Sequence, residues 1–114
     1  MTLMIDVERH DPTTLVVLRG DLDALTAPDL RNTLVEVIGE GTRIVIDMEA
    51  VEFLDSAGLG ILVGGLKRAR THDGEIELVC TSRDVLRPLE ITGLDRSFTI
   101  HRSREDALRR APQA

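Results

Sequence analysis

The apolar run Ile44-Val45-Ile46 constrains the fold most strongly, because it lacks the alternation of apolar and polar residues that a half-covered strand shows. Strands of this kind are buried on both faces, as in sheets whose strands are joined by crossover helices. We therefore expect a central strand with helices packed against the sheet. This expectation places the chain in the α/β class, and its 114 residues suffice for one continuous core.

Other segments supply the neighbouring strands. Leu3, Ile5 and Val7 alternate with polar residues, which predicts an edge strand with one covered face. Residues 14–19 are rich in β-branched side chains, and the turn at 10–12 lets them pair back on the first strand as a hairpin. Residues 75–80 and 98–100 predict two further strands, about five in all.

The helices are predicted from caps and from apolar periodicity. Thr26 is placed to cap a first helix, with Pro28 in its first turn, Leu25 and Leu30 as a hydrophobic staple, and glycines 39 and 41 at its end. A second helix begins at Ser56, a third runs from a Ser82 cap to Gly93 with Pro88 inside it, and a fourth spans 103–110. The expected order is β-β-α-β-α-β-α-β-α in one mixed-sheet domain over residues 1–114, with residues 111–114 frayed.

Composition excludes several classes of function. A net charge of -6 and only 2% aromatic residues argue against nucleic acid as a partner. No apolar run approaches the ~20 residues that span a bilayer, and acidic residues interrupt the N-terminus too early for a signal peptide, so we expect a cytoplasmic protein without membrane insertion. His10, His72 and His101 are expected at the surface and show no metal-ligand spacing with Cys80, which is expected in the core.

The segment from Asp47 to Gly60, expected to connect the central strand to the second helix, carries the chemistry. Ser56 falls at the N-cap or in the first turn, with its hydroxyl at the positive end of the helix. On its chemistry alone, a serine at this position is more often a simple cap. Four glycines in the same helix each cost about 1 kcal/mol relative to alanine. Either the helix packs closely on the sheet, or it admits the backbone of another molecule; the four are Gly58, Gly60, Gly64 and Gly65.

Three stretches resemble the anti-sigma factor antagonists of the STAS domain family. Asp55-Ser56-Ala57-Gly58-Leu59-Gly60 is similar to the phosphorylation motif of that family, Gly20-Asp21-Leu22-Asp23 to the stretch before its first helix, and Ile44-Val45-Ile46-Asp47 to its central strand. The similarity extends over almost the whole chain. The departures are Ala57, where the family carries Ser or Thr, and Asp21, where Glu is usual. The resemblance implies a STAS-like fold, with Ser56 intact as the phosphate acceptor.

The resemblance also implies a regulatory cycle. The unphosphorylated protein binds an anti-sigma factor that is itself a serine kinase, which releases a sigma factor. Phosphorylation of Ser56 ends the binding, and a PP2C-type phosphatase restores it. We expect no cofactor and no metal, and we expect these residues to form the partner surface: Asp21, Asp23, Thr26, Asp55, Ala57, Gly58, Leu59 and Gly60. The turn roles of Asp21 and Asp23 and a capping role of Thr26 are alternative explanations.

Two other classes of function remain as alternatives. A STAS-type subunit of a membrane transport complex would keep the fold without phosphorylation, although it has no need of an acceptor hydroxyl. A small enzyme with Asp55 or Ser56 as nucleophile would need a base, and no histidine occupies a recognisable position for one. Gly58-Leu59-Gly60 does not match the Gly-x-Gly-x-x-Gly spacing of a dinucleotide loop.

Overall fold

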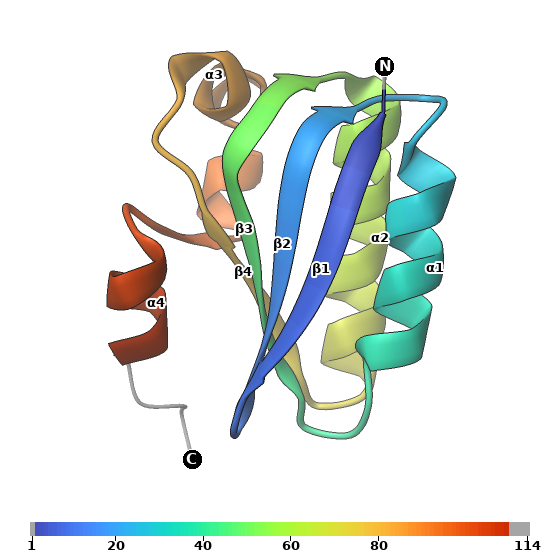
Figure 1. The fold of residues 1–114 in the computed structure, drawn as a ribbon, viewed down its shortest axis with the longest axis vertical. Coiled ribbons are helices and arrows are strands. Elements are labelled where there is room, and N and C mark those ends of the chain that lie inside the picture. Colours follow the sequence, from blue (N-terminus) through green and yellow to red (C-terminus); the bar gives the residue numbers. More distant parts are fainter. Residues whose placement is uncertain (1, 110–114) are drawn as a thin grey trace.

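The computed structural model describes residues 2–109 and contains a five-stranded sheet in the spatial order β1-β2-β3-β4-β5. β1 pairs antiparallel with β2, and every other neighbouring pair is parallel (Figure 1). The predicted hairpin and mixed sheet are therefore confirmed. The strands are β1 (Leu3–His10), β2 (Thr13–Leu22), β3 (Arg43–Leu54), β4 (Glu75–Val79) and β5 (Thr99–His101).

Two long helices lie side by side over one face of this sheet (Figure 1): α1 (Ala27–Val37) and α2 (Ser56–Thr71). The chain continues through α3 (Arg83–Ile91), a short 3-10 turn at Leu94–Arg96, and α4 (Arg104–Arg109), which packs against the opposite face. The predicted order of strands and helices is confirmed. The predicted end of the last helix at Arg110 and the frayed tail lie outside the described residues.

β3 runs through the middle of the core, as its sequence predicts. Ile44 and Ile46 point toward α1 and α2, Val45 points toward α4, and all three side chains are fully buried. Burial on both faces explains the absence of alternation in this run. Leu25, in contrast, is 84% exposed, so the expected staple with the buried Leu30 does not form.

β2 and β3 both extend beyond their predicted ends. β2 continues to Leu22, and β3 continues to Leu54, so residues 47–54 belong to the strand and not to a connection. The pairing between the two strands shifts register twice, at Val17/Arg19 and at Gly20/Asp21. Such irregularities interrupt the period of two, which is why the sequence pattern ends early. The extension brings the carboxyl ends of both strands to the start of α2.

A buried polar network lies beneath α4 near the amino-terminal end of β3. Arg43 donates to both carboxylate oxygens of Glu77 (2.9 and 2.7 Å), to the Thr13 hydroxyl (3.0 Å) and to the Ala107 carbonyl (2.7 Å). The ring Nε2 of His101 lies 2.6 Å from Glu77 Oε1, with only 10% of the His101 side chain exposed. The expectation of a surface histidine is therefore wrong for His101, because its ring completes this network.

The network sets the ionisation of its central carboxyl group. Burial by itself raises the pKa of Glu77, but hydrogen bonds from Arg43 and His101 outweigh burial and hold that pKa below its ordinary value. Glu77 is therefore an anion at neutral pH. Its charge balances the guanidinium group of Arg43, which is also buried.

Candidate functional site

The site expected from the sequence forms where β2 and β3 end and α2 begins. The Asp55 amide donates to the Leu22 carbonyl (3.3 Å), and Asp55 Oδ2 accepts a hydrogen bond from the Ala24 amide (3.2 Å). These two contacts join the loop after β2 to the first turn of α2. Loops that follow neighbouring parallel strands converge at one edge of a sheet, and this edge carries ligand sites in open α/β folds.

Asp55, not Ser56, is the N-cap of α2. Its Oδ1 accepts a hydrogen bond from the Gly58 amide (3.0 Å), which satisfies one of the first-turn donors. The capping role considered for Ser56 is therefore filled by its neighbour. Ser56 is the first residue of the helix and is exposed to solvent. Within residues 2–109 its hydroxyl has no hydrogen-bond partner, so this group is free to react or to bind.

The start of α2 can also accommodate negative charge. Within the described chain, the backbone amides of Ser56 and Ala57 have no acceptor, since the Asp55 side chain accepts only the Gly58 amide from the first turn and the Leu59 amide bonds to the Asp55 carbonyl. Free amides and the helix dipole together favour an anion at such a position. A phosphate on Ser56 would lie beside these donors.

The loop after β2 is held by its own side chains. Asp23 Oδ1 accepts hydrogen bonds from the amides of Leu25 (2.9 Å) and Thr26 (3.1 Å). The Thr26 hydroxyl donates to the Asp21 carbonyl (2.7 Å) and accepts from the Asp23 amide (3.0 Å), and it does not cap the helix. The expected cap at Thr26 is therefore wrong in its chemistry, because the hydroxyl closes the loop instead.

Burial divides the predicted site residues into two groups. Asp21 is 3% exposed and Thr26 is 5% exposed, and Gly58 is also buried, so these three shape the site from below. The others reach the surface at least in part: Asp23, Asp55, Ser56, Ala57, Leu59 and Gly60. Only this second group is available to a partner in the present conformation.

The four glycines of α2 separate into two pairs. A Cβ on Gly58 would lie 2.6 Å from the Leu22 carbonyl oxygen, so packing there requires glycine. One on Gly65 would lie 2.8 Å from Leu34 Cδ1, so that side chain would have to move to make room. A Cβ on Gly60 or Gly64 would meet nothing within 4 Å. Close packing within the chain therefore explains Gly58 and Gly65. Approach of another molecule is still a possible explanation for Gly60 and Gly64.

Sequence reasoning missed two exposed apolar side chains near Ser56. Leu25 is 84% exposed and follows Ala24, whose amide bonds to Asp55, while Phe53 is 51% exposed at the end of β3. Large apolar side chains left in water close together are typical of a protein-binding surface. An aromatic residue two positions before Asp55, in a chain with only two phenylalanines, could have indicated it.

Three further features of the described residues concern metal binding, thiol reactivity and membrane crossing. Residues 2–109 contain no cluster of histidine, cysteine, aspartate or glutamate that could hold a metal ion. Burial raises the pKa of the Cys80 thiol to about 11, which makes this side chain a poor nucleophile. Among the same residues, no helix combines the length and the apolar character needed to cross a bilayer.

Comparisons with known proteins identify relatives of this chain. An anti-sigma-B factor antagonist of Staphylococcus aureus is 38% identical over 95 residues, covering 82% of this chain and 88% of that protein. The crystal structure of an anti-sigma factor antagonist from Mycobacterium paratuberculosis superposes with a TM-score of 0.85 at 34% identity, covering 94% of this chain and 92% of the other.

A more distant neighbour shares the fold alone. The Bacillus cell fate determinant SpoIIAA in its phosphorylated form superposes with a TM-score of 0.74 at 23% identity, covering 93% of this chain and 97% of that chain. The sequence profile of the STAS domain matches residues 4–107. With nearly all of its described residues inside that match, this chain belongs to the STAS domain family.

Proposed function

We propose that this chain is an anti-sigma factor antagonist that is switched by phosphorylation of Ser56. The observation that carries the proposal is the exposed Ser56 hydroxyl at the first position of α2, free of hydrogen bonds within the described residues and beside two free backbone amides. The names of the relatives supply the kind of partner, an anti-sigma factor. SpoIIAA, a protein of the same fold, exists in a phosphorylated form and is a precedent for such a switch.

Phosphorylation would leave the fold intact and change the surface. The phosphate adds roughly two negative charges, which the N-terminus of α2 tolerates through its amides and its dipole. Asp55 and Asp23 already carry carboxylates at this edge. A dianion added beside them would be desolvated by any partner that packs on the neutral hydroxyl. Binding, and not folding, is therefore the property that the phosphate controls.

The rest of the proposed cycle comes from the resemblance to anti-sigma factor antagonists. The anti-sigma factor acts as the serine kinase, so the chain is its substrate and performs no catalysis of its own. A PP2C-type phosphatase removes the phosphate and restores binding. Leu25 and Phe53 form the apolar part of the surface that the partner covers. A cytoplasmic location is part of the same proposal, because partners of this kind act there.

The direct test is phosphorylation in solution. Incubation with ATP and the anti-sigma factor, followed by peptide mass spectrometry, should place a single phosphate on Ser56, and Ser56→Ala should abolish it. Ser97→Ala is a matched control, because that hydroxyl is also exposed but does not lie at the start of α2, and the variant should not change the phosphate count. Phosphate found only at other positions contradicts the proposal. Capture of a permease or a transport ATPase without a serine kinase would favour a subunit of a membrane transport complex.

A further inference from the structure

A groove of about 310 Å³ runs between α1 and α2, lined by Arg31, Leu34, Val35, Ile38, Gly60, Ile61, Gly64, Gly65 and Arg68. We call it the α1–α2 groove. Its floor is apolar, and Val35 leaves 41% of its surface in water there. The volume lies at the lower limit of small-molecule pockets, which are ~300 to 1,000 Å³, and it suits a few apolar side chains of another protein.

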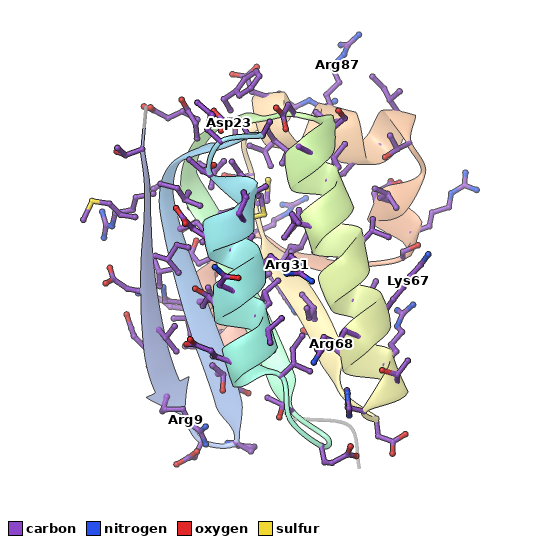
Figure 2. The ribbon with its side chains drawn as sticks, turned by 90° about the vertical axis from the view of Figure 1, so that its right-hand side faces the viewer. Arg9, Asp23, Arg31, Lys67, Arg68 and Arg87 are labelled. Atoms are coloured by element: carbon purple, nitrogen blue, oxygen red, sulfur yellow. The ribbon has the colours of Figure 1, made fainter. Side chains whose placement is uncertain are left out.

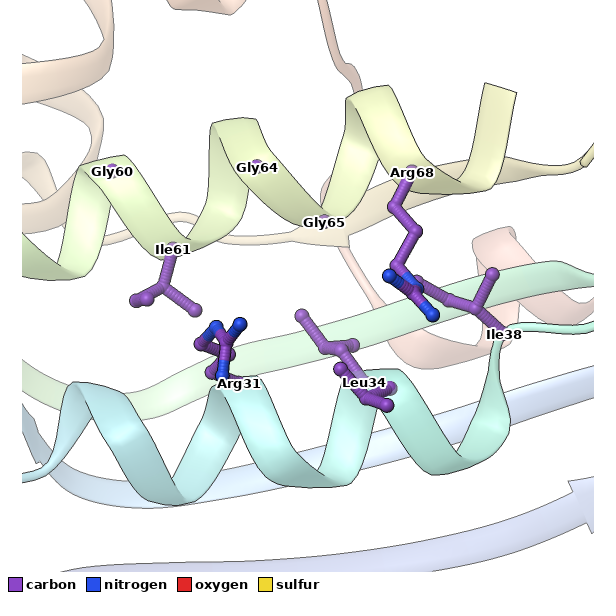
Figure 3. Close-up of a pocket in the computed structure, with 9 residues that line it drawn as sticks. Arg31, Leu34, Ile38, Gly60, Ile61, Gly64, Gly65 and Arg68 are labelled. Atoms are coloured by element: carbon purple, nitrogen blue, oxygen red, sulfur yellow. The ribbon is translucent and has the colours of Figure 1, made fainter. Parts of the chain in front are cut away.

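Two guanidinium groups give the α1–α2 groove a positive charge. Arg31 reaches toward α2 and Arg68 reaches toward α1, so the two cations flank the apolar floor (Figure 3). Neither guanidinium has an ion pair or hydrogen bond to any residue between 2 and 109, although the chain as a whole carries a net charge of -6. Two unpaired cations in an acidic protein complement an anionic partner.

The α1–α2 groove begins one helical turn beyond Ser56, since Gly60 is the first residue of α2 that lines it. Ser56, Gly60, Gly64 and Arg68 follow one another at steps of four residues, so each is the surface neighbour of the next along a ridge that turns gradually around α2. The first three of these positions expose either a hydroxyl or bare backbone. A partner that covers Ser56 can therefore extend along this ridge to Arg68. Figure 2 shows Asp23 above α1 and both arginines on the face formed by the two helices.

The two glycines at this surface fit a helix as the occupant. Packing within the chain does not require Gly60 or Gly64, since a Cβ at either position would meet nothing within 4 Å. Glycines four residues apart remove the side chains that would keep a second backbone away, which permits close helix packing. An extended peptide or a small anion gains nothing from that spacing.

We infer that the α1–α2 groove binds an acidic, amphipathic helix of the same anti-sigma factor that covers Ser56. Apolar side chains of that helix fill the floor formed by Leu34, Ile38 and Ile61, and its carboxylates pair with Arg31 and Arg68. The inference rests on the proposed function. It adds a second contact surface that phosphorylation does not touch directly.

The test is the affinity of the unphosphorylated chain for the anti-sigma factor, measured by calorimetry at low and high salt. The double variant R31E/R68E should bind at least ~10-fold more weakly at low salt, with a smaller loss at high salt, because screening weakens charge pairs. Lys67→Glu is the matched control, since Lys67 is an exposed neighbour outside the groove and should stay within about twofold. All of these side chains are exposed, so the variants should fold.

A second variant tests the space in the groove. Gly64→Leu should weaken binding ~10-fold or more at both salt concentrations, because its Cβ meets nothing within 4 Å and Gly64 lines the groove that the new side chain would fill. Asn32→Leu adds the same side chain at an exposed position of α1 outside the groove and should have little effect. Thermal melting of each variant confirms that it is folded.

The outcomes separate the inference from the proposed function. If the groove variants bind the anti-sigma factor as tightly as the parent and Ser56→Asp binds it more weakly, the inference is overturned and the proposed function is retained. If Ser56→Asp also binds as tightly as the parent, the proposed function is contradicted. Groove variants that change the oligomeric state of the chain but not its affinity show that a second copy occupies the groove, which also overturns the inference.

Discussion

The two ends of β3 use their polar side chains in different ways. Near the amino-terminal end, Arg43 and Glu77 are buried and satisfied by each other, by His101 and by neighbouring elements. At the carboxyl end, Asp55 accepts backbone amides of its own loops, and the next residue, Ser56, leaves its hydroxyl in water. The comparison shows that the first end stabilises the fold, while the second holds a hydroxyl group in place without covering it.

Removal of a charge from the buried network at the amino-terminal end of β3 should have the largest effect on the free energy of unfolding. Glu77→Ala leaves the Arg43 guanidinium buried without its anion, and breaking such a pair costs about 3–5 kcal/mol. Urea denaturation measures the loss. The folded fraction should still be phosphorylated on Ser56 at the parent rate, because the network lies at the other end of β3. A loss below about 1 kcal/mol would mean that the network contributes little to the fold.

The same carboxyl group should make the fold sensitive to acid. Because the pKa of Glu77 is lowered in the folded state, its contribution is fully present at neutral pH. That contribution begins to disappear below the ordinary glutamate pKa of about 4.3 and is lost as the pH falls through the lower pKa of the folded state. Denaturation between pH 7 and pH 3 should show a shallower decline for Glu77→Gln than for the parent. Parallel pH curves would contradict this assignment.

At the carboxyl end of β3, substitution of the N-cap residue Asp55 should have a moderate effect on the free energy of unfolding. Asp55→Ala removes the acceptor for the amides of Gly58 and Ala24 and should cost about 1–2 kcal/mol of unfolding free energy. Asp55→Asn keeps an oxygen acceptor and should recover most of that loss. If asparagine destabilises as much as alanine, the carboxylate charge, and not the cap, holds the loop.

The smallest effect should come from the unpacked glycines and should have the opposite sign. Gly64→Ala should stabilise the protein by up to about 1 kcal/mol, because its Cβ meets nothing and alanine favours the helix. Gly58→Ala is the matched comparison and should destabilise, since its Cβ would lie 2.6 Å from a backbone oxygen. Equal effects at both positions would refute the division of the glycines into two pairs.

Local patterns were enough to predict much of this molecule. The unbroken apolar run at Ile44 to Ile46 predicted the central strand, and the residues around Ser56 predicted the start of α2. The Asp55 contacts confirm that the loop after β2 meets this start. Each of these features depends on residues close in sequence or on the general geometry of parallel sheets.

Features that depend on distant partners escaped prediction. Arg43 and Glu77 are 34 positions apart, and His101 meets them only through the register of β4 and β5. The sequence suggested a single explanation for all four glycines of α2, either close packing or the approach of another molecule. In the structure the contacts of these glycines differ with the side of the helix on which each one lies. Both features follow from packing that a linear pattern does not contain.

The regulatory role of Ser56 depends most directly on what a phosphate there does to partner binding. Calorimetry should compare the unphosphorylated chain with chain phosphorylated only at Ser56, each titrated with the anti-sigma factor at the same salt concentration. We predict affinity about 100-fold weaker for the phosphorylated chain, equivalent to roughly 3 kcal/mol, with unchanged thermal stability. Equal affinities for the two forms would contradict the central claim.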